Sequence, residues 1–239
     1  MRKLMLLWLL VPIVGMSQEK NVINVTRVFP KIDKTAEFEK ALVAHAAKFH
    51  TGDWKWMVSE IQTGPDAGGY SIVEGPVNWD QVDKRGDLGA EHQNDWNKNI
   101  TIYLTDKYQS SFVEFKEELS NGKLTDYSEK YMVNHVFLKP GMYAEAVAII
   151  KNVKKVWEAS NQTVIVYEAS ASGAPQFAIV TRYKTGLKER QAGFLKPMAE
   201  RYEAANGAGS FKTYTEGVSK VTDQSWSELL FMRPDLGSK

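Results

Sequence analysis

The chain has 239 residues, of which 43% are hydrophobic and 25% are charged. This is the composition of an ordinary globular protein, with room for one large domain or two small ones. The absence of cysteine excludes disulfides, thiolate metal sites and a cysteine nucleophile. The formal net charge of +1 argues against non-specific nucleic-acid binding, which depends on basic patches.

Residues 1–17 read as a secretory signal peptide. Arg2 and Lys3 precede an apolar run over 4–14, and small residues follow it. The run is too short for an ordinary membrane span, although a retained N-terminal anchor is the alternative. We therefore expect an exported protein, periplasmic or secreted. A chain of this size without disulfides favours a bacterial source. Its charge after cleavage is 28 − 29 = −1.

The first half alternates strand and helix patterns. Residues 22–29 are rich in β-branched side chains, which predicts a strand, and 35–49 carry apolar residues at helical spacing. Residues 54–62 and 70–75 read as the two strands of a hairpin, joined by a glycine-rich turn at 63–69.

The rest of this half is less regular. Residues 78–96 favour a helix, but Gly86 and Gly89 would weaken or break it. Residues 100–108 are ambiguous, and 112–119 can supply a fourth, edge-type strand.

The pattern of residues 21–60 returns at 129–168, and the offset between the two copies stays constant throughout. Val25 meets Val133 in this alignment, and a constant offset through two strands and a helix indicates a tandem duplication. The elements predicted for the second copy are a strand at 131–138, a helix at 143–157, strands at 163–169 and 176–183, a helix at 187–204 and a strand at 226–232.

Each copy therefore reads β-α-β-β-α-β, the ferredoxin-like unit in which helices cover one face of a four-stranded antiparallel sheet. The predicted fold class is α+β, with two tandem ferredoxin-like units packed sheet-to-sheet as an intrachain α/β barrel. The first half spans 18–120 and the second 129–239, with a short polar linker between them. Fusing the halves makes the pairing of their bare faces intramolecular.

With its first strand at 22–29, its long amphipathic first helix and its glycine-rich hairpin turn, the chain resembles the dimeric α/β-barrel superfamily. That group includes antibiotic-biosynthesis-type monooxygenases, stress-responsive barrel proteins, chlorite dismutase relatives and haem-degrading monooxygenases. The resemblance covers nearly all of the chain after residue 17. It implies the fold more specifically than the function, because this superfold carries unrelated chemistries.

The resemblance suggests three catalytic candidates, Asn24, Trp79 and His92. In the haem-degrading branch an asparagine lies on the first strand, a tryptophan and a histidine lie near the second helix, and the histidine ligates iron. The sequence indicates no other cofactor. Haem is therefore expected only if His92 ligates its iron. The alternative is that Trp79 caps the hairpin, His92 is solvated and Asn24 bonds locally.

Two equivalent pairs of polar residues, Arg27 with His135 and Glu60 with Glu168, lie on predicted strands. If their faces line the space between the sheets, they form an apolar pocket with a few convergent polar groups, the usual form of a small-molecule site. The neighbours expected there are Trp56, Val166 and Phe137. The ligand-binding candidates are therefore Arg27, Trp56, Glu60, His135 and Glu168. Buried ion pairs without a ligand are the alternative.

The remaining histidines, His45 and His50, predict no metal site. They are five residues apart, so they do not stack on one helical face as an i, i+4 pair does. His45 is interpreted as a packed core histidine and His50 as a helix-end residue.

Three functions remain open from the sequence. The first is an exported binder of a small, partly apolar molecule. The second is a monooxygenase-like or haem-binding or haem-degrading enzyme, and the third is a structural or interaction protein without a ligand. The expected partners include no nucleic acid and no membrane span after signal cleavage, and the two halves form a pseudo-dimer within one chain.

Overall fold

The structure is a computed structural model that describes residues 19–239, so the predicted signal peptide lies outside the described residues. The elements of the first half are β1 (Val22–Pro30), α1 (Thr35–Phe49), β2 (Trp56–Ile61), β3 (Tyr70–Val77), α2 (Trp79–Arg85), α3 (Gly89–Asp95) and β4 (Leu104–Phe115). Those of the second half are β5 (Lys130–Leu138), α4 (Tyr143–Ala159), β6 (Thr163–Ser170), β7 (Gln176–Arg182), α5 (Met198–Asn206), α6 (Ser210–Val221) and β8 (Thr222–Met232).

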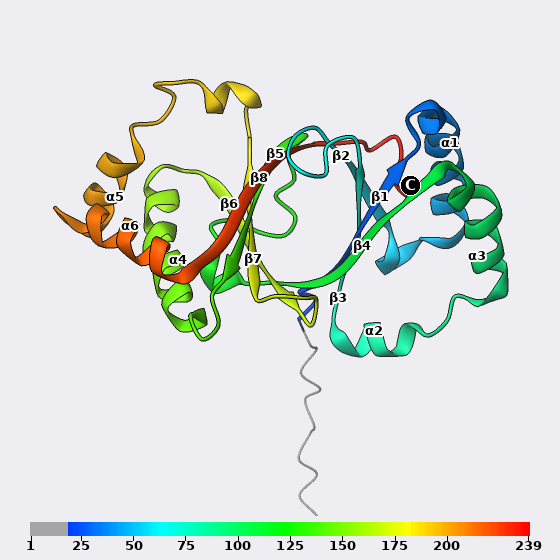
Figure 1. The fold of residues 1–239 in the computed structure, drawn as a ribbon, viewed down its shortest axis with the longest axis horizontal. Coiled ribbons are helices and arrows are strands. Elements are labelled where there is room, and N and C mark those ends of the chain that lie inside the picture. Colours follow the sequence, from blue (N-terminus) through cyan, green and yellow to red (C-terminus); the bar gives the residue numbers. More distant parts are fainter. Residues whose placement is uncertain (1–18) are drawn as a thin grey trace, which may run out of the picture.

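The eight strands form one closed antiparallel barrel in the order β1-β3-β2-β8-β5-β7-β6-β4. Within it, β4-β1-β3-β2 and β8-β5-β7-β6 are two four-stranded sheets with the same ferredoxin-like order. Figure 1 shows the barrel in the middle, with α1 to α3 on one side and α4 to α6 on the other. The predicted α+β fold of two tandem ferredoxin-like units is confirmed.

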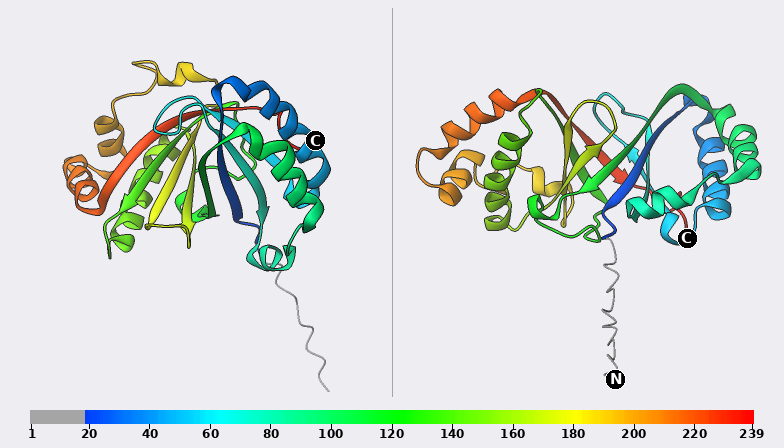
Figure 2. Two further views of the ribbon diagram at one scale, coloured as in Figure 1. Left: turned by 45° about the vertical axis from the view of Figure 1, so that its right-hand side comes forward. Right: turned by 90° about the horizontal axis from the view of Figure 1, so that it is seen from below.

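The two halves meet edge to edge at two seams, and Figure 2 shows the barrel from two further sides. In one seam β2 pairs with β8, where Glu60 lies opposite Phe231. In the other β4 pairs with β6, where Phe115 lies opposite Tyr167. Because both seams are backbone ladders, no sheet edge is left open between the halves.

Along each strand, successive side chains point alternately into the barrel and toward its outer side. On β1, Ile23, Val25 and Arg27 point into the barrel, whereas Val22 and Val28 point to the outer side. Helices cover this outer side and bury a separate hydrophobic core in each half. The barrel interior is thus enclosed by the strands, together with residues of the linker between the halves such as Leu124 and Tyr127.

The duplication is visible in the element bounds. β5 begins at Lys130 and α4 at Tyr143, and both starts keep the offset of the sequence alignment from their counterparts in the first half. The same alignment pairs Tyr70, the first residue of β3, with Ala178. β7 begins earlier, at Gln176, because the second hairpin turn is shorter.

The region 78–96 forms two helices, as its glycines suggested. Gly86 and Gly89 have φ angles of 62° and 85°, in the left-handed region that favours glycine. The chain therefore turns between α2 and α3, and Trp96, which directly follows α3, packs against the core that α1 covers. The ambiguous stretch at 100–108 and the predicted strand at 112–119 are largely one long strand, β4.

The predicted helix at 187–204 is wrong over most of its length. Leu187–Arg190 is a single 3₁₀ turn, and α5 starts only after Pro197. Helix α6 was not predicted from the sequence; it begins after a turn where Gly207 and Gly209 have φ angles of 102° and 77°. Proline and glycine interrupt the apolar pattern here, so two short helices replace one long one.

Candidate functional site

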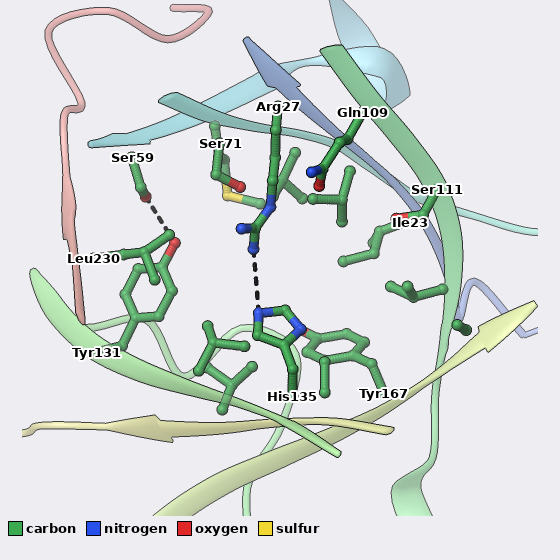
Figure 3. A pocket seen from close by; sticks show the side chains of 18 of the residues that line it. Ile23, Arg27, Ser59, Ser71, Gln109, Ser111, Tyr131, His135, Tyr167 and Leu230 are labelled. Carbon is green, nitrogen blue, oxygen red and sulfur yellow. Dashed lines mark hydrogen bonds between the residues drawn. The ribbon is translucent and has the colours of Figure 1, made fainter. Parts of the chain in front are cut away.

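The barrel encloses a cavity of about 650 Å³. This volume lies within the range of sites for small organic molecules, roughly 300–1,000 Å³. Figure 3 shows side chains from both halves pointing into it, among them Ile23, Ser71 and Tyr167. The wall is mainly apolar and includes Val25, Met57, Val73, Val113, Leu124, Val133, Phe137, Ala169, Ala178, Val180 and Leu230.

Arg27 and His135 meet inside the cavity, as Figure 3 shows. They occupy equivalent positions of the two copies, and Arg27 Nη2 lies 3.3 Å from His135 Nε2. Both nitrogens face Glu228 of β8, whose Oε1 accepts from His135 Nε2 at 2.8 Å and from Arg27. Asp66 lies 2.6 Å from Arg27 Nη1 and also pairs with Lys107.

The Arg27 network is internally neutralised. Burial alone would raise the pKa of Glu228, but hydrogen bonds from His135 and Arg27 lower this pKa below its ordinary value. Because Glu228 and Asp66 balance the guanidinium and Lys107, these four groups leave no charge for a ligand to neutralise.

Arg182 of β7 is the second cation of the cavity wall, and its surroundings are different. It is 8% exposed, donates to Leu124 O at 3.1 Å and lies 3.5 Å from the Tyr167 hydroxyl. No carboxylate among residues 19–239 forms an ion pair with it. Asp126 lies at the adjoining rim, where its carboxylate accepts from Lys123 N.

Two tyrosines give the wall hydroxyl groups. The Tyr131 hydroxyl donates to Ser59 Oγ at 2.8 Å, as drawn in Figure 3. Burial raises the pKa of Tyr167 to about 12, so its hydroxyl stays protonated at neutral pH. The cavity therefore combines apolar walls with neutral hydrogen-bonding groups and one cation without an ion-pair partner in the described chain.

A second cluster lies outside the barrel, between the helices and the sheet of the first half. His45 of α1, His50 just after α1, and His92 of α3 bring their Nε2 atoms together. The three Nε2 to Nε2 distances are 3.2, 3.4 and 3.4 Å. His45 and His50 are buried and His92 is partly exposed.

Two carboxylates orient the buried histidines of this cluster. His45 Nδ1 donates to Asp95 at 2.7 Å, and His50 Nδ1 donates to Glu74 at 2.8 Å. Glu74 in turn accepts from Trp56 Nε1 at 3.2 Å and from Arg85. Burial lowers the pKa of all three histidines, against the carboxylates.

Comparison with known proteins gives likenesses of structure. No protein-family model matches the sequence, and no curated protein matches it. A candidate monooxygenase from Lactobacillus acidophilus has a TM-score of 0.52 at 14% identity, covering 92% of this chain and 97% of that one. An anthrone oxidase-like protein has a TM-score of 0.54 at 14% identity, covering 90% and 92%. A candidate chlorite dismutase has a TM-score of 0.52 at 9% identity, covering 90% and 97%.

The chain has the dimeric α/β-barrel fold. The suspected resemblance is confirmed at this level: the likenesses extend over almost the whole chain, and both sheets have the ferredoxin-like order. At these identities the likeness concerns the fold alone. No helix in residues 19–239 is long and apolar enough to cross a membrane.

The dimeric α/β barrel brings only part of the predicted pocket together. Arg27, His135 and Phe137 line the cavity, as expected. Glu60 instead lies near Arg233, at 3.7 Å, and Glu168 pairs with Lys116 at 2.8 Å, both on the outer side. Their placement in the cavity was wrong, because on β2 it is Met57 and Ser59 that point inward.

Trp56 and Val166 also differ from the expectation. Both belong to the helix-covered cores of the barrel, and Trp56 stacks on His50 with ring centroids 3.7 Å apart. The inward face of β2 and β6 could not be predicted from the sequence, because both faces of these strands carry apolar residues.

Asn24, Trp79 and His92 do not assemble into one site through any contact found in residues 19–239. Asn24 Nδ2 donates to Ser110 Oγ at 3.3 Å, and Trp79 Nε1 donates to Glu114 at 3.0 Å. His92 is instead part of the three-histidine cluster. The catalytic roles of these residues are not tested by this placement.

The joint site of His45 and His50 was not predicted from the sequence. The i, i+4 spacing rule applies within a helix, but His50 lies beyond Phe49, the last residue of α1, with φ −118° and ψ 81°. Its side chain is therefore free to return beside His45. One signal was present: the equivalents of His45 and His50 in the second copy are Val153 and Glu158, so the histidines are confined to one half.

Proposed function

We propose that this protein binds a small, partly apolar molecule carrying a carboxylate or similar anion inside the barrel. The proposal rests on Arg182, which is a buried cation on an apolar cavity wall and has no ion-pair partner in the described chain. Burying an unpaired charge is costly, and an anionic ligand would remove that cost. Apolar lining with few polar groups is the usual form of such a site.

The ligand's charged end is assigned to Arg182 and not to Arg27. Arg27 already has two carboxylates within 2.9 Å, Glu228 and Asp66. A ligand anion beside it would be repelled by both. The two arginines therefore play different roles: Arg27 ties the two halves together across the cavity, and Arg182 receives the ligand.

The test uses two probes of equal chain length, decanoate and decanol. Binding is measured by displacement of 1-anilinonaphthalene-8-sulfonate and by the rise in Tm, because a ligand of the folded state stabilises it by mass action. We expect Arg182→Gln to weaken decanoate about tenfold or more, as loss of a charge-assisted hydrogen bond of about 1.5–3 kcal/mol predicts, with little effect on decanol.

Arg201→Gln is the matched control. Arg201 donates to Gln162 Oε1 at 2.7 Å and is absent from the cavity wall. Its variant should bind both probes as the native chain does. Equal loss of decanoate in both variants would count against an anion site at Arg182.

A second variant, Ala178→Phe, tests whether the cavity is the site at all. Ala178 lines the wall, and a phenyl ring there would occupy ligand space. Probe binding should fall for decanoate and decanol alike. If neither probe binds the native chain and no apolar acid raises its Tm, the ligand-free structural role gains the support instead.

A monooxygenase is the second candidate function, because some structurally similar proteins are named as candidate monooxygenases. The enzyme alternative with Asn24, Trp79 and His92 lacks an assembled set of side chains, because Asn24 and Trp79 bond elsewhere. The cavity is therefore proposed as a binding site, without a reaction assigned to it.

Export remains part of the proposal. It is supported by Arg2 and Lys3 followed by the apolar run at 4–14. Intact mass measurement on protein secreted by a bacterial host should give a chain beginning at Gln18. A full-length mass in the membrane fraction would indicate a retained anchor.

A further inference from the structure

We propose that His45, His50 and His92 form a mononuclear binding site for a first-row divalent transition-metal ion, with Zn²⁺ as the best geometric fit. The site lies on the helix-covered side of the first half, apart from the cavity, and it does not depend on the proposed ligand function. Three features support it: the spacing of the nitrogens, their protonation pattern and the carboxylates that hold the rings.

The spacing matches a tetrahedral ion. Zn²⁺ binds imidazole nitrogen at about 2.0–2.1 Å, and tetrahedral angles then place ligand nitrogens about 3.3–3.4 Å apart. The three Nε2 atoms are separated by 3.2, 3.4 and 3.4 Å. A single ion can therefore contact all three without moving the side chains.

The positions of the hydrogens on the histidine rings favour a bound cation between the Nε2 atoms. Because a carboxylate only accepts, Nδ1 of His45 carries a hydrogen toward Asp95, and Nδ1 of His50 carries one toward Glu74. Neutral rings then present lone pairs at both Nε2 atoms, which face each other 3.4 Å apart. A single N–H from His92 cannot satisfy the lone pairs of both His45 and His50 well. A metal ion, in contrast, accepts the lone pairs of all three histidines.

The carboxylates behind the rings have the arrangement found around metal-bound histidines, in which the other ring nitrogen donates to a carboxylate. Asp95 is itself held by Asn99 Nδ2 at 2.9 Å, and Glu74 is held by Trp56 and Arg85. Around the rings, Phe49 and Trp96 provide apolar packing. The imidazoles are thus preorganised by both hydrogen bonds and packing.

The site is open. Only three side chains make up the metal-ligating cluster in residues 19–239, and the partly exposed His92 gives solvent access. Three protein ligands with an exchangeable fourth are typical of catalytic zinc sites, whereas structural sites supply four. We assign the fourth position to water or a small anion.

A haem iron cannot be ligated by these three histidines together. The macrocycle fills four equatorial positions, so protein ligands must lie on opposite faces of the ring. The three imidazole nitrogens lie within 3.4 Å of one another, which requires adjacent positions on one ion. A site that uses all three histidines is therefore assigned to a bare ion.

The experiment strips the full chain with EDTA and titrates it with Co²⁺ and Zn²⁺. We expect one equivalent of Co²⁺ to give visible bands of tetrahedral intensity, Zn²⁺ to displace it, and Zn²⁺ to raise the Tm. Added azide should shift the cobalt bands by occupying the fourth position. Absence of stoichiometric binding overturns the site, and an unchanged spectrum with azide overturns its open position.

Matched variants separate this site from adventitious binding. His92→Ala, or His92→Gln if the first fails to fold, should lose the cobalt bands and the Zn²⁺-dependent rise in Tm. Asp95→Asn should retain binding but weaken it about 10–100-fold, the usual effect of losing a hydrogen-bond partner of a metal-bound histidine. Glu91→Gln removes an exposed carboxylate beside His92 and should bind as the native chain does.

Three further results would contradict the proposal. They are unchanged cobalt binding in the His92 variants, loss of binding in Glu91→Gln, and a 1:1 haemin Soret band that disappears in the His92 variants. The first two indicate surface binding and the third indicates haem. The decanoate test of the cavity is unaffected by any of them, so the two proposals fail separately.

Discussion

Among single residues, the buried charges of this barrel are of two kinds, those in ion pairs and those without one in the described chain. Arg27 forms ion pairs with Glu228 and Asp66, and the Glu228 side chain is fully buried. Such a network costs desolvation when it forms and much more when one partner is removed. Arg182 is buried to the same extent as Arg27 but is not part of any ion pair in the described chain. This contrast is the reason why Arg27 is given a structural role and Arg182 is proposed to bind the ligand.

Glu228→Gln should destabilise the fold by about 3–5 kcal/mol at pH 7, the usual cost of breaking a buried pair. The pKa of Glu228 is lowered in the folded state, so its contribution is present above the unfolded pKa of about 4.3 and is lost as pH falls through the folded value. Arg27 and His135 face this carboxylate. Urea unfolding should therefore show a smaller difference in the free energy of unfolding between the variant and the native chain at pH 3 than at pH 5.

At the scale of elements, the histidine cluster depends on chain ends and turns. His92 reaches the cluster because Gly86 and Gly89 redirect α3, and His50 reaches it because α1 ends at Phe49. The C-terminal segment, which lies beside α1 in Figure 1, holds this corner in place. Ser238 Oγ donates to His50 O at 2.5 Å, and Ser238 N donates to Trp56 O at 3.0 Å.

Deleting residues 237–239 should weaken Zn²⁺ binding by about tenfold, within the range for lost support of a metal-bound histidine. The deletion frees the backbone of His50 but leaves all three imidazoles in place. Competition with a zinc-sensitive dye measures the affinity, and decanoate binding in the cavity should not change. Deleting Lys239 alone is the control, since it leaves both Ser238 bonds intact. Equal zinc affinity in both deletions would show that the segment does not position His50.

At the scale of the whole molecule, closure of the barrel links the duplicated halves. The seams β2–β8 and β4–β6 are continuous with the sheets on either side, and the cavity is lined from both halves. A half opened at its seams would expose two strand edges and the apolar cavity wall. The halves should therefore depend on each other for stability.

Native-state hydrogen exchange should show this dependence. The slowest amides of β1 and β5, which lie in the middle of the two sheets, should exchange with free energies equal within about 0.5 kcal/mol. Such equality is expected when both open only in global unfolding. A difference of several kcal/mol, with one half exchanging independently, would mean that the seams do not couple the halves.

The fold could be predicted largely from the sequence. The constant offset between the two copies and the change from strand to helix period depend on local patterns, which survive in one dimension. The prediction failed where the pattern was interrupted, as at 187–204, because Pro197 and Gly207 break a helix more strongly than apolar spacing extends it.

Local sequence patterns specify the duplicated α/β barrel. The sequence also shows that Arg27 and His135 occupy equivalent positions and that His45, His50 and His92 all belong to one copy. The tertiary structure, in contrast, sets which strand faces point inward, since both faces of β2 and β6 carry apolar residues. It alone brought the three histidines together. Their convergence depends on where α1 ends and how α3 folds back, and these are properties of packing in three dimensions that no spacing along the chain records.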